Sequence, residues 1–232
     1  MLRNDILTAR NLALTPELHD YLLDQGRMTP DAVLAELIEL THKAVPDQAH
    51  MTVAPEEGAL LTFLVRLLGA RDIVEVGTFT GYSSLCLARG LPPGGSLITC
   101  DVSAEWTALA RGFWARAGVA DRIELRLGDA LDTLRAMPAE PHLDLAFIDA
   151  DKPGYISYWE ELVPRLRPGA LLLVDNTLFN GEVIDDEPSA KPAAVRAFNE
   201  HARRDDRVQL VMLPLADGLT MARRLPSGEL PI

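Results

Sequence analysis

Apolar residues are spaced differently in the first and the second part of the chain. In residues 1–70 they recur at helical intervals, most clearly after Ala54-Pro55, where one face of the expected helix carries Leu60, Leu61, Leu64, Leu67 and Leu68. Two further helix starts are expected at Thr15-Pro16-Glu17 and Thr29-Pro30-Asp31. Each offers an N-cap residue, a proline at the first helical position and an acid in the first turn.

From Arg71 onward, short apolar runs alternate with helical segments. Such runs are typical of parallel strands that are buried on both faces and joined by right-handed crossovers. The expected strands are 72–76, 97–101, 123–127, 145–148 and 171–174, followed by a hairpin of 208–213 and 219–223. The expected helices are 82–89, 103–118, one that stops before Pro138, one between the fourth and fifth strands, and one near 192–204. The pattern predicts an α/β fold: a doubly wound, Rossmann-like, seven-stranded, mostly parallel sheet with one antiparallel strand, preceded by N-terminal helices.

Composition limits the partners of this protein. A chain of 232 residues with 48% hydrophobic and 24% charged residues is expected to form a single globular domain over 1–232. The net charge of −12 argues against nucleic acid as a partner, since phosphate binding needs a cationic surface. Cys86 and Cys100 lie in apolar runs, as expected for buried thiols in a reducing compartment. No secretory signal or membrane-spanning stretch is found, so we expect a cytoplasmic protein with no membrane partner.

Two of the expected strands end in acidic residues. Asp149 follows the strand that ends at Ile148, and Asp175-Asn176 follows the strand that ends at Val174. Neighbouring parallel strands lie about 4.8 Å apart, so on adjacent strands both carboxylates and the amide oxygen can reach one cation. An all-oxygen ligand set suits Mg²⁺, with Mn²⁺ or Ca²⁺ possible, rather than zinc. The alternative is that these are ordinary polar residues at strand ends.

A glycine-containing loop, Glu75 to Gly81, follows the first expected strand and opens a helix, as a nucleotide-binding turn does. Phe79 stands where a dinucleotide-binding loop has its second glycine, and no Gly-Lys-Ser/Thr follows, so a cofactor without phosphates is favoured. Asp101 ends the second strand, where an acid can bind the hydroxyls of a ribose. Ala130 is placed to border an adenine, although Asp129 before it can equally be a helix cap.

Six segments in order resemble one family. They are MTVAPEEGALL (51–61), VEVGTFTGYSSLCLA (74–88), LGDALDTL (127–134), FIDADKPGYISYW (147–159), VDNTLFNGEV (174–183) and LPLADGLTMARR (213–224). Together they resemble the cation-dependent O-methyltransferases of the caffeoyl-CoA and catechol type, which use S-adenosylmethionine. The resemblance implies that the whole chain is a single class I methyltransferase domain, with residues 1–50 helping to shape the acceptor pocket. It also implies a homodimer.

The resemblance assigns a role to individual positions. The implied metal ligands are Asp149, Asp175 and Asn176, and the implied catalytic residues are Lys152 and Asp149. The residues implied to line S-adenosylmethionine are Met51, Val53, Glu75, Gly77, Thr78, Ser83, Asp101, Ala130, Asp149 and Asp151. Asn180 and Lys152 are implied to face the acceptor. Val53 departs from the threonine that plant members often have, so a side-chain hydrogen bond is lost there.

The implied reaction is divalent-cation-dependent transfer of a methyl group to a hydroxyl of a vicinal-diol, catechol-like aromatic small molecule. A phenol with a pKa near 10 is mostly protonated at neutral pH, and a chelated cation favours the reactive phenolate. Lys152 can then act either as the base or as a charged stabiliser. Two other functions stay open at this point: a nicotinamide-dependent oxidoreductase and a catalytically idle, methyltransferase-like partner subunit.

Overall fold

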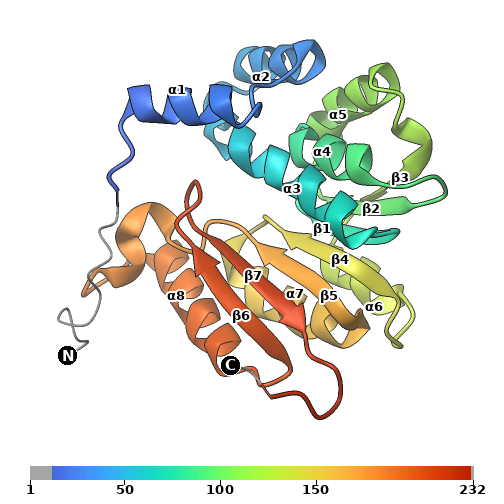
Figure 1. Ribbon diagram of the computed structural model, residues 1–232, viewed down its shortest axis with the longest axis vertical. Coiled ribbons are helices and arrows are strands. Elements are labelled where there is room, and N and C mark those ends of the chain that lie inside the picture. Colours follow the sequence, from blue (N-terminus) through green and yellow to red (C-terminus); the bar gives the residue numbers. More distant parts are fainter. Residues whose placement is uncertain (1–11, 231–232) are drawn as a thin grey trace.

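A seven-stranded sheet forms the centre of the computed structural model, which describes residues 12–230 (Figure 1). Its strand order is β3-β2-β1-β4-β5-β7-β6. The strands are β1 (Asp72–Val76), β2 (Ser96–Asp101), β3 (Ile123–Leu127), β4 (Leu143–Ile148), β5 (Leu166–Val174), β6 (Val208–Leu213) and β7 (Leu219–Arg224). Strand β7 runs antiparallel to both of its neighbours, whereas β1 to β5 pair in parallel. The predicted fold and the single antiparallel strand are confirmed.

Helices connect and cover these strands. They are α1 (Pro16–Gln25), α2 (Ala32–Ala44), α3 (Pro55–Leu68), α4 (Tyr82–Gly90), α5 (Ala104–Arg116), α6 (Ala130–Ala136), α7 (Tyr155–Leu162) and α8 (Ala190–Arg203). Short 3-10 turns are η1 (Ala49–Met51), η2 (Ala120–Arg122), η3 (Lys152–Gly154), η4 (Val163–Arg165) and η5 (Phe179–Ile184). No helix among residues 12–230 is long and apolar enough to span a membrane.

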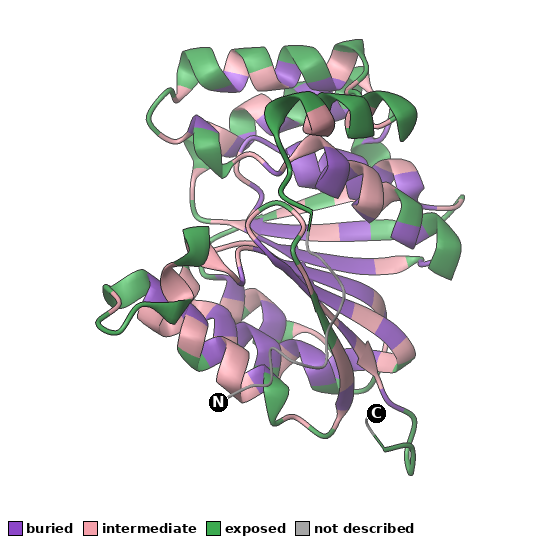
Figure 2. Ribbon diagram, turned by 60° about the vertical axis from the view of Figure 1, so that its left-hand side comes forward, coloured by how far each residue is buried: buried purple, intermediate pink, exposed green. Residues whose placement is uncertain are grey.

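The sheet separates two apolar layers because side chains alternate along each strand. Ile73, Phe147 and Leu173 face the layer built with α2, α3, α4 and α5. Val74 and Ile148 face the layer built with α6, α7 and α8. Figure 2 shows buried residues along the strands and on the helix sides that face them. Both layers are filled, so the ligand-accessible edge of the sheet is the one where the parallel strands end.

The N-terminal helices begin close to where the sequence predicts. Thr15 caps α1 by accepting a hydrogen bond from the Leu18 amide at 3.3 Å. The predicted cap of α2 was wrong: Asp31, not Thr29, is the N-cap, and its carboxylate accepts hydrogen bonds from the amides of Val33 and Leu34. A carboxylate satisfies two free amides at once, so the helix starts after the acid and leaves Pro30 outside.

The inward face of α3 differs from the predicted one. Leu61 and Leu64 are buried as expected, but Leu67 is 67% exposed and Leu68 is 39% exposed. At 3.6 residues per turn, Leu67 lies about 120° around the helix from Leu61. Val65 is fully buried and lies on the inward side with Leu61 and Leu64. The apolar face of α3 is therefore narrower than the leucine pattern predicts.

Substitution of Phe198 in α8 tests the packing on the side of the sheet that α7 covers. It is fully buried and meets the rings of Tyr155 and Trp159 edge-on, each at 5.5 Å between centroids. We predict that Phe198→Ala lowers the free energy of unfolding by about 3–5 kcal/mol, measured by urea denaturation. The control is Phe63→Ala on α3, where the side chain is 60% exposed and we expect a change within about 0.5 kcal/mol. Equal losses in the two variants would contradict the packing described here.

Candidate functional site

The carboxyl ends of β1, β4 and β5 are joined by backbone hydrogen bonds beyond the strands themselves. The Asp149 amide donates to the Val76 carbonyl at 2.9 Å, and the Asp175 amide donates to the Ile148 carbonyl at 3.0 Å. The predicted adjacency of β4 and β5 is confirmed by their register, which pairs Ile148 with Val174. The two acidic residues are therefore fixed side by side at one edge of the sheet.

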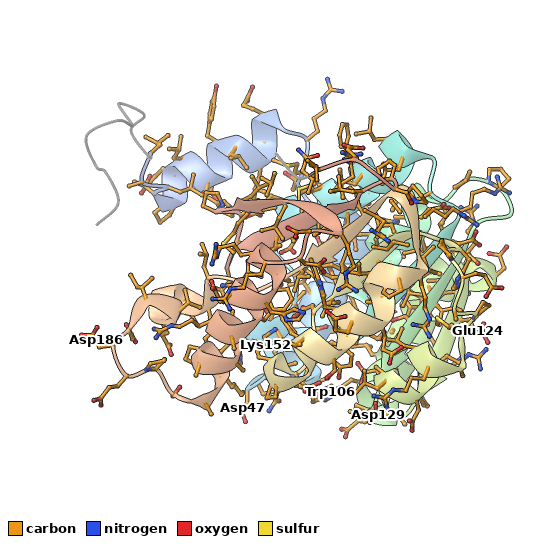
Figure 3. The ribbon with its side chains drawn as sticks, turned by 90° about the horizontal axis from the view of Figure 1, so that it is seen from below. Asp47, Trp106, Glu124, Asp129, Lys152 and Asp186 are labelled. Atoms are coloured by element: carbon orange, nitrogen blue, oxygen red, sulfur yellow. The ribbon has the colours of Figure 1, made fainter. Side chains whose placement is uncertain are left out.

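Lys152 joins these strand ends. It begins η3, and its ammonium lies 3.1 Å from Asp149 Oδ1, 2.6 Å from Asn176 Oδ1 and 2.5 Å from the hydroxyl of Tyr155. That hydroxyl donates in turn to the Asp175 carbonyl at 3.1 Å. Lys152 lies near the middle of the molecule in Figure 3, whereas Asp186 lies at its periphery. Side-chain oxygens from the ends of two strands thus converge on a single cationic group.

Asp175 is the most buried carboxylate of this group, with 3% of its surface exposed. Burial and the nearby charge of Asp149 raise its pKa, against the opposing effect of the hydrogen bond from the Asn176 amide. Asn176 itself has a left-handed backbone, with φ of 56°. Asparagine tolerates that conformation better than most residues, which explains an asparagine at the point where the chain turns away from β5.

The residues present fit a hard divalent cation. Asp149, Asp175 and Asn176 offer only oxygen donors, and two of them already share one cationic neighbour. Within residues 12–230 no group of three or more His, Cys, Asp or Glu side chains is arranged as a metal site. The donor set is thus two carboxylates and one amide, which leaves room for oxygens from water or substrate.

The glycine loop is shaped by the strands around it. Gly77 has φ of 101°, and a Cβ on it would lie 1.8 Å from the Asp149 carbonyl oxygen. Asp101 Oδ2 accepts hydrogen bonds from the amides of Thr78 and Phe79, and its Oδ1 accepts one from Ser103. The predicted ribose ligand Asp101 is therefore also the residue that fixes the loop.

Glu75 lies inside this end of the site with no exposed surface. Its Oε2 accepts a hydrogen bond of 2.5 Å from the Thr99 hydroxyl, while its Oε1 has no partner within residues 12–230. Burial raises the pKa of Glu75 to about 8, and the hydroxyls of Ser83 and Thr99 oppose the shift. A buried carboxyl oxygen without a partner costs free energy, so this position fits the binding of a ligand's hydroxyl or amino group.

The other predicted cofactor residues differ in how deeply they are buried. Val53, Thr78, Ser83 and Ala130 are buried, whereas Met51 is 42% exposed. Ala130 begins α6 directly after Asp129, whose carboxylate caps the helix through the Leu131 amide. Asp151 is exposed and accepts a hydrogen bond of 2.6 Å from the Tyr158 hydroxyl.

Asn180 stands apart from the Lys152 cluster. It is exposed on η5 with φ of 52°, and its amide donates to Asp217 Oδ1 at 2.5 Å. Among residues 12–230 no hydrogen bond joins its side chain to Asp149, Lys152 or Asn176. That Asn180 faces the methyl acceptor stays a prediction.

Two further residues belong to this edge of the sheet: the sequence did not predict Glu57, and it favoured packing over a place beside the acceptor for Tyr155. Tyr155 bridges Lys152 to the end of β5. Glu57, in the first turn of α3, has only 1% of its surface exposed. Their spacing in the sequence could have indicated both residues. Glu57 precedes Leu61 by four residues and so shares its inward helix face. Tyr155 follows Lys152 by three residues.

Comparison with known proteins identifies the family. The profile of a family described as O-methyltransferase matches residues 27–225. The chain belongs to this family. It is 38% identical to caffeoyl-CoA O-methyltransferase 2 of Zea mays, over 93% of this chain and 86% of the relative. It is 40% identical to catechol O-methyltransferase domain-containing protein 1 of Mus musculus, over 91% and 82%. The resemblance stated from the sequence is confirmed.

Solved structures agree. An O-methyltransferase from Bacillus cereus in complex with SAH has a TM-score of 0.80 and 34% identity, covering 90% of this chain and 97% of that one. The O-methyltransferase TomG of Streptomyces achromogenes in complex with SAM has a TM-score of 0.81 and 34% identity, covering 90% and 96%. The protein is an S-adenosylmethionine-dependent O-methyltransferase, which removes the nicotinamide and idle-subunit alternatives.

Gly77→Ala tests the close approach of the glycine loop to β4. We expect it to displace the Asp149 backbone and to lower the affinity for S-adenosylhomocysteine, measured by calorimetry. The matched control is Gly169→Ala, where φ is 88° but no atom lies within 4 Å of an added Cβ. We expect the control to lose about 1–2 kcal/mol of stability from left-handed strain and to retain cofactor affinity. Loss of affinity in both variants would assign the effect to strain and not to the contact.

Proposed function

We propose that this enzyme transfers the methyl group of S-adenosylmethionine, with the help of a divalent cation, to a hydroxyl of a vicinal-diol aromatic small molecule. The observation that supports the proposal is the convergence of Asp149 Oδ1 and Asn176 Oδ1 on one cationic group at the end of β4 and β5. Mg²⁺ is the preferred ion, with Mn²⁺ or Ca²⁺ as alternatives, because all donors are oxygens.

Asp149, Asp175 and Asn176 would hold the cation. Its chemistry, when bound, is that of a Lewis acid that favours the phenolate form of the acceptor and orients two neighbouring oxygens. The backbone bonds from Asp149 to β1 and from Asp175 to β4 fix the spacing of the two carboxylates. A donor set that is positioned before the acceptor arrives lowers the entropic cost of ordering the reactants.

Lys152 would stabilise the negative charge that develops on the acceptor oxygen. An ammonium has three hydrogens to donate, and the Lys152 ammonium has three acceptors: Asp149, Asn176 and the Tyr155 hydroxyl. All three hydrogens of the ammonium are thus directed at oxygen atoms. We therefore prefer electrostatic stabilisation over proton abstraction as the role of Lys152.

The cofactor would lie between the glycine loop and the end of β2. The methyl group that S-adenosylmethionine supplies is attached to a sulfonium, and Glu75, Asp101 and Asp151 are the acids around its expected position. The unpartnered oxygen of Glu75 accepts from a cofactor hydroxyl or ammonium group in this arrangement. Ala130 would present its backbone amide to the adenine, and Met51 and Val53 would pack against the cofactor.

The acceptor class rests on the relatives. Two relatives are named caffeoyl-CoA O-methyltransferase 2 and catechol O-methyltransferase domain-containing protein 1, and these names support an aromatic acceptor. An acceptor that chelates the cation needs two neighbouring oxygens. Asn180 and the N-terminal segment would border the acceptor, although residues 1–11 lie outside the described part. The homodimer and the cytoplasmic location stay predictions from the sequence.

Removal of metal tests the cation directly. We predict that excess chelator abolishes methylation of vicinal-diol aromatics, measured with a labelled methyl donor, and that added Mg²⁺ or Mn²⁺ restores it. The physical reason is that, without the cation, the acceptor hydroxyl stays protonated at neutral pH. Full activity in excess chelator would contradict the proposed cation dependence. A monohydroxy aromatic is the control acceptor, and no cation-dependent methylation of it is expected.

Substitution of Lys152 tests its role. We predict that Lys152→Ala lowers turnover by about 100–1000-fold and leaves the affinity for S-adenosylhomocysteine nearly unchanged, because its contacts are to the cation and acceptor side. Steady-state kinetics and calorimetry measure the two effects. Lys191→Ala, at an exposed position at the start of α8, is the charge-matched control. Equal losses of turnover and cofactor affinity would contradict the assigned role.

A further inference from the structure

The first turn of α3 reaches the same edge of the sheet as the Lys152 cluster. Helix α3 ends at Leu68, and β1 begins at Asp72 after a short turn with Gly69 in the left-handed conformation. The helix therefore runs back antiparallel to β1, and its 14 residues span about 21 Å. Its amino end lies where β1, β4 and β5 have their carboxyl ends.

Glu57 occupies that turn and is almost completely enclosed. Only 1% of its surface is exposed, and neither carboxylate oxygen has a hydrogen-bond partner within residues 12–230. In the preceding Glu56 one oxygen is partnered, since its Oε1 lies 2.9 Å from Nε2 of His19, and only its Oε2 has no partner within residues 12–230. An enclosed carboxylate without partners is costly unless a ligand supplies them.

The charges around Glu57 belong to the proposed cation site. Burial raises its pKa most, and the carboxylates of Asp175 and Asp149 raise it further, whereas Lys152 lowers it. Asp149, Asp175 and Lys152 are therefore close enough to Glu57 to act on its charge. A divalent cation held by Asp149 and Asp175 would supply the positive charge that this enclosed acid lacks.

We propose that Glu57 is a further residue of the cation site and accepts a hydrogen bond from water that hydrates the cation. An indirect contact is chosen because, within the described part of the chain, no three acidic side chains form a direct ligand cluster. Residues that contact a metal through its ligands orient those ligands and affect metal affinity. The inference rests on the proposed cation dependence.

The experiment measures Mn²⁺ binding by calorimetry in the full-length protein saturated with S-adenosylhomocysteine. Glu57→Gln keeps the shape of the side chain and removes its charge. We expect its Mn²⁺ affinity to be about 10–100-fold lower than that of the unchanged protein, with S-adenosylhomocysteine affinity retained. Glu56→Gln is the matched control, adjacent and also buried, and its Mn²⁺ affinity is expected to be unchanged.

The outcomes separate the two proposals. If the unchanged protein binds no Mn²⁺, the proposed cation dependence fails, and this inference fails with it. If the unchanged protein binds Mn²⁺ and Glu57→Gln binds it equally well, only the role of Glu57 is overturned. An equal loss in Glu56→Gln and Glu57→Gln would also overturn it, because the effect would then belong to the turn and not to the enclosed carboxylate.

Two further measurements distinguish this role from a purely structural one. Without metal, the midpoint of thermal unfolding of Glu57→Gln is expected to equal or exceed that of the unchanged protein, because an unpartnered acid is replaced by a neutral group. A lower midpoint would indicate a structural role. A crystal structure of the unchanged protein with Mn²⁺ is expected to show a water that contacts both the ion and Glu57, and absence of that water would overturn the proposal even if the variant did not fold.

Discussion

The constraint on which the site depends is the burial of negative charge at the carboxyl edge of β1, β4 and β5. Glu75, Asp175 and Glu57 are each enclosed almost completely, and burial is the largest influence that raises the pKa of each. Lys152 is the one cationic side chain of the described chain that hydrogen-bonds to Asp149 and Asn176. Enclosed acids in excess of their cationic partners destabilise a fold unless ligands compensate. This edge is therefore suited to ligands that carry positive charge, as the sulfonium of S-adenosylmethionine does.

The fold keeps these acids in place with backbone contacts that leave little freedom. The amide of Asp149 bonds to β1, and the amide of Asp175 bonds to β4, so each acid is fixed by the neighbouring strand. Gly77 allows the glycine loop to lie directly against the Asp149 carbonyl, and Asp101 fixes the amides of that loop. The glycine loop and the Lys152 cluster thus meet at Asp149.

Much of this arrangement is predictable from the sequence, and the limits have physical causes. Apolar runs that end in Asp149 and Asp175 predict strands and their acidic tips, because a strand buried on both faces has a distinct composition. The cap at Asp31 was missed because Thr29 and Asp31 are both good N-cap residues, and the exposure of Leu67 was missed because its place on the helix face depends on which leucines pack inward. Glu57 was missed, and Tyr155 was expected only to pack or to border the acceptor. The enclosure of Glu57 and the hydrogen bonds of Tyr155 depend on the tertiary packing around them, which local patterns do not encode.

Helix α7 holds two neighbouring side chains of one loop by separate contacts. Asp151 and Lys152 are adjacent, yet the Tyr158 hydroxyl bonds to Asp151 and the Tyr155 hydroxyl to Lys152. The tyrosines are three residues apart and so lie on one face of the helix, and Gly154 lacks the Cβ that would lie 2.5 Å from the Tyr158 ring. Tyr155 is fully buried against Phe198, and Trp159 is anchored to Asp205 at 2.8 Å. Because α7 is fixed by packing against α8 in the same layer of the core, the positions of Asp151 and Lys152 are supported by that packing and not by the loop alone.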